Sequence, residues 1–301
     1  MWDFIGKRNI FFVLSGLLII GTFAYSMQFW PRPLNLGIDF TGGTDVLLNV
    51  PALAQQSDSE VGRGKFLEGF RSVITPLGLE RSVLQVVEKT QVSMRTRSLN
   101  NEQRDALVAA LTQAYPGSEV MEVDTIGPTV GAQLRTASIW IVALSSLGIL
   151  IYLTFRFEFI FGLAAIVATL HDALITLGIS AVFRVEVDTA FVAAILTIIG
   201  YSVNDTIVLF DRVRERLADN YQGSLKDLLN LSIRQTLGRT INTVLTVLFM
   251  VLALYLFGGS TIHDFSFVML VGVSIGTYSS IFIAVPIVYA FRSRIMASEK
   301  A

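Results

Sequence analysis

The chain has 301 residues, of which 52% are hydrophobic and 16% charged, and its mean hydropathy is +0.61. Soluble domains carry about 25% charged residues, so this composition excludes an ordinary soluble protein and indicates an integral membrane protein in a lipid bilayer. The net charge of −1 argues against a nucleic-acid partner, because there is no basic surplus to neutralise phosphates.

Six apolar runs are long enough to cross a membrane, which takes about 20 mostly apolar residues. They cover approximately residues 10–29, 137–155, 159–183, 189–210, 240–257 and 265–291. The first run ends in Met27-Gln28-Phe29-Trp30, with no small-residue cleavage site. We therefore expect it to be a retained anchor and not a cleaved signal peptide.

Basic residues in the short loops predict how the spans are oriented. The short loops of one side hold only Arg184, whereas the other side collects Lys7, Arg8, Arg156, the basic residues between 211 and 238, and those from Arg292 onward. The basic side is expected to be the cytoplasm, so both termini are predicted to be cytoplasmic.

This orientation divides the chain into four parts. Residues 1–30 are predicted to be the cytoplasmic N-terminus and first span, and residues 31–136 an extracytoplasmic domain. Residues 137–291 are predicted to hold the other five spans, with a cytoplasmic loop at 211–238. Residues 292–301 are expected to form a cytoplasmic tail.

The segment 31–136 shows the pattern of a compact α+β domain. Strands are predicted at 44–50, 82–88, 90–97 and 119–123, from apolar or alternating residues. Helices are predicted after the capping pattern of Ser57 and Glu60 and after Asn100. The order βαββαβ is that of a ferredoxin-like sandwich between the first and second spans.

The polar segment 211–238 carries Leu225, Leu228, Leu229 and Ile233 at helical spacing. This spacing predicts an amphipathic helix. It would either lie on the inner membrane surface or pack against neighbouring spans, and the pattern does not decide between the two.

An aspartate and an arginine lie at matching depths on consecutive spans. Asp205 is six residues from Asp211, where the apolar run ends, so it lies roughly 9 Å inside the boundary at 1.5 Å per residue. Arg239 lies five residues past Arg234, at roughly 7–8 Å from the same side. Because an intramembrane carboxylate costs roughly 2.5–3.5 kcal/mol on insertion scales, Asp205 is expected to be functional.

Polar residues also form stripes on three spans, at spacings of three and four. The stripes comprise Thr169, Asp172, Thr176 and Ser180, with His171 beside them; Thr197, Tyr201, Asn204 and Asp205; and Arg239, Asn242 or Thr243, and Thr246. If all three faced inward, they would form a wet path through the bundle. Asn204, His171, Asp172, Asn242 and Thr243 would then support the central pair.

Two interpretations of the Asp205–Arg239 pair remain open at this point. In a proton relay, Asp205 gains and loses a proton while Arg239 adjusts its affinity for that proton. In a static clamp, the same charges only hold helices together. Gly272-x-x-x-Gly276 in the last span indicates close helix packing and not chemistry.

Enzymatic functions find no support in the motifs. HExxH, GxGD and GxSxG are absent, and the glycines before Lys65 do not complete GxxxxGK[ST]. There is no cysteine and there are only two histidines, so no metal site is expected. The chain is therefore predicted not to be an enzyme and to need no cofactor, so an ion gradient or a partner must supply any energy. The proton relay described above would make protons the coupling ion.

Several segments resemble the SecD/SecF family of bacterial protein-export membrane proteins, on its SecF side. They are Gly37–Thr44 (GIDFTGGT), Val130–Leu134 (VGAQL), His171–Gly178 (HDALITLG), Gly200–Glu215 (GYSVNDTIVLFDRVRE) and Arg239–Thr243 (RTINT). The resemblance covers most of the chain, and the six-span layout with one large outer domain agrees with it.

The resemblance implies a function in protein export across the bacterial inner membrane. It implies SecD as a partner, a relation to RND exporters, and assistance to the SecYEG channel in moving precursor polypeptides with the proton-motive force. It also implies that Asp205 and Arg239 are the proton-path pair.

Two other functions remain as alternatives. An RND-type exporter half for small molecules or lipids would need an aromatic cleft in the outer domain, which offers Phe66, Phe70 and Tyr115. A non-transporting scaffold of the translocon would not need the charge of Asp205.

Overall fold

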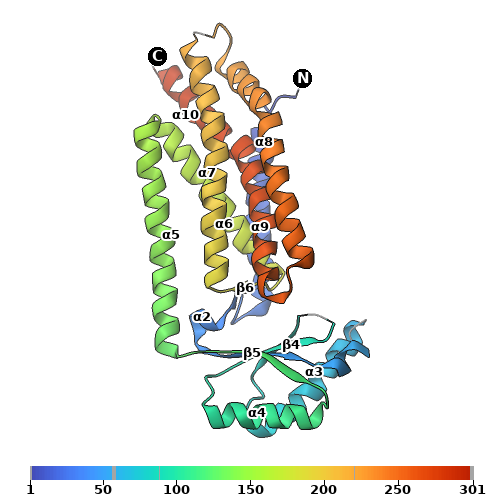
Figure 1. Cartoon of the computed structure of the whole chain (residues 1–301). Helices are drawn as coiled ribbons and strands as arrows, with labels where there is room; N and C mark the ends of the chain where they lie inside the picture. The colour runs from blue at the N-terminus through green and yellow to red at the C-terminus, as the bar shows by residue number, and fades with distance from the viewer. Residues whose placement is uncertain (1, 56–58, 88, 220, 299–301) are drawn as a thin grey trace. The chain divides into compact units, whose positions relative to one another are not determined.

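The computed structural model describes residues 2–55, 59–87, 89–219 and 221–298, and it contains two compact units (Figure 1). The helical unit comprises Met1–Asn35 and Ile139–Ala301, and the α+β unit comprises Leu36–Ser138. Helix α5 (Pro128–Arg156) runs without a break from one unit into the other. The α+β unit therefore begins and ends slightly later than the predicted boundaries of 31–136.

Six helical segments of the described chain are long and apolar enough to cross a membrane, which confirms the number of predicted spans. Five of them are α1 (Arg8–Ser26) with the short η1 (Met27–Phe29), α5, α6 (Phe159–Val182), α7 (Thr189–Ala218) and α8 (Leu225–Phe257). The sixth consists of α9 (Ser260–Ser279), the π-helical turn η4 (Ser280–Ala284) and α10 (Val285–Ser298). The last span thus continues as a helix into the predicted tail of residues 292–301.

Three of the spans form the centre of the helical unit. Helices α6, α7 and α9 pack on one another, and 56%, 50% and 61% of their most apolar stretches are buried, the last including η4 and α10. The corresponding share is only 6% for α5, which stands at the edge of the bundle in Figure 1. The outer helices therefore leave their apolar side chains for lipid or for another protein to cover.

The helices extend beyond the predicted membrane boundary, so most of the segment 211–238, predicted as a cytoplasmic loop, is helical. Helix α7 continues to Ala218 and α8 already begins at Leu225, where Ser224 caps it through the amide of Asp227. Leu228, Leu229 and Ile233 are all buried in the main apolar core. The amphipathic segment is therefore the start of α8 packed on the bundle, and not a separate helix on the membrane surface.

The N-terminus is bound to this first part of α8. The Asn230 side chain accepts a hydrogen bond from the Phe4 amide at 2.8 Å and donates one to Asp3 at 3.0 Å. Lys226 forms an ion pair with Asp3. The hydrogen bond from Lys226 lowers the pKa of Asp3 from 3.8 to about 2.

Two short strands, β1 (Asn35–Leu36) and β6 (Glu186–Val187), lie near the ends of α1 and α6. The Asn35 side-chain amide donates to the Arg184 carbonyl at 2.7 Å. The Asp264 carboxylate accepts a hydrogen bond from the Glu186 amide at 2.9 Å, which joins this connection to the start of α9.

The α+β unit has the predicted order of elements. Its strands are β2 (Gly43–Asn49), β3 (Val83–Val86), β4 (Gln91–Thr96) and β5 (Glu119–Ile126). Its helical segments are α2 (Ile38–Thr41), η2 (Pro51–Gln55), α3 (Glu60–Ile74), η3 (Thr75–Leu77) and α4 (Asn101–Ala114). The strands form one antiparallel sheet in the order β3-β4-β2-β5.

The two longer helices of the α+β unit are capped as their sequences require. Asn100 and Gln103 form the reciprocal hydrogen bonds of a capping box at the start of α4. Ser59 caps α3 by accepting from the Gly62 amide. The predicted cap at Ser57 lies outside the described residues. Phe70 and Leu107, from the apolar faces of α3 and α4, are buried in the same core.

The GIDFTGGT segment forms a tight turn within the α+β unit. Gly42 has a φ of +70° and Gly43 a φ of +137°, conformations that residues with a Cβ rarely adopt. A Cβ on Gly42 would lie 2.8 Å from the Cα of Pro128, and one on Gly131 would lie 2.9 Å from the Gly42 amide nitrogen. The glycines of GIDFTGGT and VGAQL therefore allow the two segments to touch.

Candidate functional site

Asp205 is buried in α7 with an incomplete set of hydrogen bonds. Its side chain is 4% exposed, and its Oδ2 atom has no hydrogen-bond partner within the described part of the chain. The adjacent Thr206 shares a hydrogen bond of 2.9 Å with Ser280, which holds this turn of α7 against η4. Leaving a buried polar atom without a partner costs about 1–3 kcal/mol of stability. The Asp205 carboxyl group is therefore stabilised either by a nearby counter-charge, when it is ionised, or by binding a proton.

Arg239 provides the nearby counter-charge. It lies on α8, which packs beside α7, and it interacts electrostatically with Asp205. Its side chain is exposed, and Asp205 Oδ2 is not bonded to it. The two residues selected by depth therefore lie on neighbouring helices, close enough to interact but not locked together. Their role in proton transfer stays a prediction.

The polar residues beside this pair face out of the chain. Asn204, Asn242 and Thr243 are all exposed. The Thr243 hydroxyl donates to the carbonyl oxygens of Arg239 and Thr240, so it serves the backbone of its own helix. The side chains of α7 and α8 near Arg239 thus form an open polar face.

Asp172 is a buried carboxylate with a hydrogen-bond partner at both oxygens. Its side chain is fully buried, and its Oδ1 lies 2.9 Å from Nδ1 of His171. Its Oδ2 accepts hydrogen bonds from Ser202 on α7 at 2.6 Å and from Ser279 on α9 at 2.7 Å. One carboxylate of α6 therefore joins three helices.

The three polar stripes do not all face the interior of the described chain. The α6 stripe is enclosed, since Thr169, Asp172, Thr176 and Ser180 are all buried. By contrast, Thr197 at the start of the α7 stripe and the whole α8 stripe are exposed. The rotation of each helix about its axis determines this difference, and spacing along one helix does not reveal it.

The prediction missed Ser202, Ser279 and Ser280. Ser202 lies three residues before Asp205, on the same face of α7, which is the one signal that could have identified it. The hydroxyl of Ser280 donates to the carbonyl of Gly276 at 3.0 Å, at the start of the π-helical turn. A π turn is frequently found at functional sites, but its position is not readable from this sequence.

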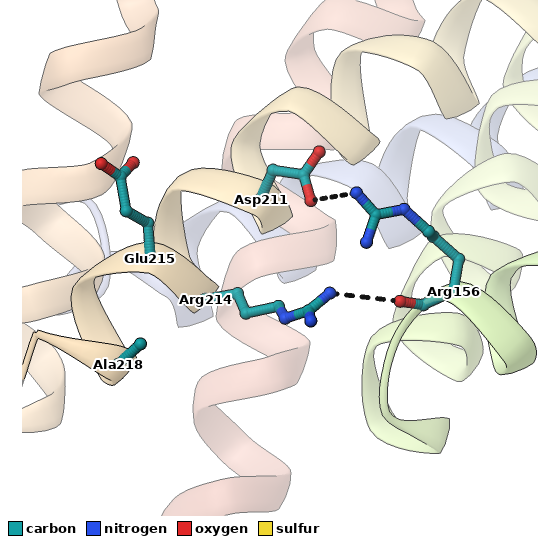
Figure 2. A pocket seen from close by; sticks show the side chains of 5 residues that line it. All are labelled: Arg156, Asp211, Arg214, Glu215 and Ala218. Carbon is teal, nitrogen blue, oxygen red and sulfur yellow. Dashed lines mark hydrogen bonds and ion pairs between the residues drawn. The ribbon is translucent and has the colours of Figure 1, made fainter.

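An open pocket of about 280 Å³ lies where α5 ends and α7 leaves its apolar part (Figure 2). It is lined by Arg156, Asp211, Arg214, Glu215 and Ala218. Arg156 pairs with Asp211 at 3.3 Å, and Arg214 donates to the Arg156 carbonyl at 3.4 Å. Both members of the ion pair are largely exposed, so the pair is worth about 0.2–1 kcal/mol.

Metal chemistry finds no support in the residues that the structure describes. Among them, no three His, Cys, Asp or Glu side chains cluster closely enough to hold an ion. The neighbour of Asp172 with metal-ligand chemistry is His171, and its Nδ1 is already engaged by the carboxylate.

Comparison with known families gives two matches. Residues 106–294 match the family described as protein export membrane protein SecD/SecF, C-terminal. Residues 32–50 match the SecD/SecF GG motif, and this stretch contains the glycine turn at Gly42 and Gly43.

Individual relatives agree with these matches. The protein translocase subunit SecF of Calditerrivibrio nitroreducens is 40% identical over 296 residues, covering 97% of this chain and 94% of the relative. The protein translocase subunit SecDF of Bacillus subtilis is 38% identical, covering 100% of this chain and 39% of the relative. The crystal structure of SecDF from Thermus thermophilus, titled a translocon-associated membrane protein, superposes with a TM-score of 0.86 at 33% identity, over 97% of this chain and 39% of that one.

Proposed function

Because the chain belongs to the SecD/SecF family of protein-export membrane proteins, we propose that it uses the proton-motive force to promote export of precursor polypeptides. It is an accessory subunit of the Sec translocase, a transport role and not an enzymatic one. The observation that carries the proton step is the buried Asp205 carboxylate, which has one oxygen without a hydrogen-bond partner among the described residues and Arg239 on the adjacent helix.

The geometry supports a cycle of pairing and release. When Asp205 is ionised, the attraction between opposite charges draws the exposed Arg239 side chain toward it, and this attraction is strengthened where water is excluded. When a proton binds Asp205, the attraction disappears and Arg239 is released. Because the two residues lie on α7 and α8, each proton changes the force between these two helices.

The partner with which this cycle operates is SecD. Relatives in which SecD and SecF form one SecDF chain support this association, and this chain spans 39% of such a relative. The exposed Asn204, Asn242 and Thr243 form the polar face that SecD would cover. The SecYEG channel and the precursor polypeptide complete the proposed assembly.

The proposed placement in the bacterial inner membrane has both termini in the cytoplasm. It is supported by the basic residues at Lys7, Arg8, Arg156 and beyond Asp211, on one side of the spans. The α+β unit would then be extracytoplasmic. Its βαββαβ order and antiparallel sheet support a ferredoxin-like sandwich.

The aromatic residues of the α+β unit do not favour a small-molecule exporter. The Tyr115 ring lies 5.3 Å from the Phe66 ring and stacks on the Phe70 ring at 5.8 Å. Phe66 and Phe70 are buried in the core of the unit. These rings therefore stabilise the fold and do not line a binding cleft.

The test is gradient-driven export of a precursor into membrane vesicles that contain the chain together with SecD and SecYEG. Asp205→Asn and Arg239→Met are expected to abolish the stimulation of export by the gradient while assembly is preserved. Asp211→Asn is a matched control, because it removes a carboxylate of α7 that is exposed and paired with Arg156. Normal gradient-stimulated export by Asp205→Asn would instead support a scaffold.

A further inference from the structure

The His171–Asp172 pair contains an imidazole nitrogen that nothing in the proposed cycle uses. Its Nδ1 lies 2.9 Å from Asp172 Oδ1, and in the tautomer with the ring hydrogen on Nδ1 the imidazole donates to this oxygen. Its Nε2 is buried and has no hydrogen-bond partner among the described residues. The His171 side chain is 8% exposed. The free lone pair of this ring therefore lies inside the bundle.

The charge of the pair is unbalanced when His171 is neutral. Ser202 and Ser279 donate to Asp172 Oδ2, and the Nδ1–H tautomer of His171 supplies a third donor at Oδ1. With this tautomer Asp172 is ionised, because a protonated carboxyl would instead donate to Nδ1 and leave the ring hydrogen on Nε2. A neutral His171 then leaves one net negative charge, which is costly in an apolar interior.

We propose that His171 and Asp172 form a second proton-binding site, in which Nε2 of His171 takes up the proton. The new bond is Nε2–H, formed with a proton from water, and the pair changes from a net charge of −1 to zero. Release of the proton reverses both changes. Asp172 keeps its three hydrogen bonds throughout, so it positions and balances the imidazolium without itself being protonated.

The groups around the pair do not compensate its charge in another way. The ionisable side chains that the surrounding helices carry in their apolar parts are Tyr25 on α1, Tyr201 and Asp205 on α7, Tyr278 on α9 and Tyr289 on α10. Arg292, at the far end of α10, is paired with Glu158. The Tyr278 ring stacks 6.0 Å from the His171 ring, and its hydroxyl is bonded to Ser15.

The second site is connected to Asp205 through α7 and η4. Ser202, which donates to Asp172, lies one turn from Asp205 on the same face of α7. The Ser280 hydroxyl lies 3.5 Å from the Ser202 carbonyl and 2.9 Å from the Thr206 hydroxyl. These hydrogen bonds connect the charge of the His171–Asp172 pair to the turn of α7 that carries Asp205. The role of this second site in export rests on the proposed proton cycle.

The chain allows a direct test because it has only two histidines. The His263→Gln variant, labelled with ¹⁵N-histidine and placed in lipid vesicles, contains His171 as its single imidazole. Its ¹⁵N resonances are expected to change from imidazolium to the neutral form with Nδ1–H as the pH is raised. Adding Asp172→Asn is expected to abolish the imidazolium signal.

Two results of this measurement would overturn the proposal. One is a neutral His171 at every pH, and the other is an imidazolium that is equally populated with and without Asp172. The measurement needs no export activity, so its failure is separate from a failure of the proposed function. Normal export by Asp205→Asn alongside titration of His171 would reject the export cycle and retain the proton site.

The assay of gradient-stimulated export then tests whether the His171–Asp172 site takes part in export. His171→Gln keeps a hydrogen-bond donor but cannot become charged, and we expect at least a tenfold loss of gradient-stimulated export. Ser274→Ala is the matched control, because the Ser274 hydroxyl bonds only the Leu270 carbonyl of its own helix. Unchanged stimulation in His171→Gln would show that the proton site has no part in export.

Discussion

Replacing Gly272 by alanine tests how closely α9 packs on α7. A Cβ at this position would lie 2.9 Å from Cγ2 of Ile198 and even closer to its Cγ1 and Cδ1. Ile198 is 1% exposed, and a β-branched residue in a helix has one strongly preferred side-chain rotamer. The side chain therefore cannot turn away, and the two helices would have to separate.

The expected loss of stability follows from two opposing contributions. Overpacking a well-packed interior costs about 1–3 kcal/mol, whereas replacing glycine by alanine inside a helix gains about 0.5–1 kcal/mol. We therefore expect Gly272→Ala to lower the free energy of unfolding by about 1–2 kcal/mol. Gly200→Ala on α7 is the matched control, since no atom lies within 4 Å of its Cβ position.

The measurement is reversible denaturant unfolding of the purified chain in mixed micelles, for Gly272→Ala, Ile198→Val and the double variant. Ile198→Val alone should cost about 0.5–1.5 kcal/mol by leaving a small cavity. In the Gly272→Ala background the same change removes one of the clashing methyl groups. The free energy of unfolding of the double variant should therefore be about 1 kcal/mol higher than the value obtained by adding the effects of the two single changes. Strict additivity, or equal stability of Gly272→Ala and Gly200→Ala, would refute the close approach of the helices.

Two further predictions concern the N-terminus and the glycine turn. Asp3→Asn should lower the hydrogen-exchange protection of the Phe4 amide at pH 7 by up to about fivefold, because it removes the surface ion pair with Lys226 beside the Asn230 side chain that binds this amide. Since the pKa of Asp3 is lowered from 3.8 to about 2, its contribution is present above pH 4 and is lost as pH falls toward 2, where wild type and variant should converge. Gly43→Ala should make the α+β unit of the full chain sensitive to protease, because the new Cβ would clash with the Thr96 carbonyl at a φ of +137°. Gly64→Ala, where no atom lies within 4 Å, should leave proteolysis unchanged.

The elements of the α+β unit were predictable because each is encoded locally. The alternation around Met94 predicts a strand, and the capping residues at Asn100 and Gln103 predict the start of α4. The end of α7 was not predictable in this way. A change from apolar to polar residues at Asp211 marks the edge of the membrane, but a helix can continue in water, and α7 does so to Ala218.

The sequence predicted how deep the site residues lie along their spans, but not how the helices are rotated toward one another. Depth along a span follows from the rise per residue, so Asp205 and Arg239 could be assigned to neighbouring positions on consecutive helices. The Asp172 cluster depends on how three helices are rotated toward one another. In addition, the side chains of residues adjacent in sequence do not ordinarily face each other on a helix. The His171 Nδ1 and Asp172 Oδ1 atoms nevertheless lie 2.9 Å apart.

The π-helical turn between Ser280 and Ala284 affects how related sequences should be aligned. A π turn contains one residue more than the α turn it replaces, so a relative with an uninterrupted helix would be one residue shorter there. The flanking helices α9 and α10 could still superpose on both sides of the difference. A single-residue gap within this stretch would therefore record a change of helix type beside Asp172, and it would not signify a missing part of the last span.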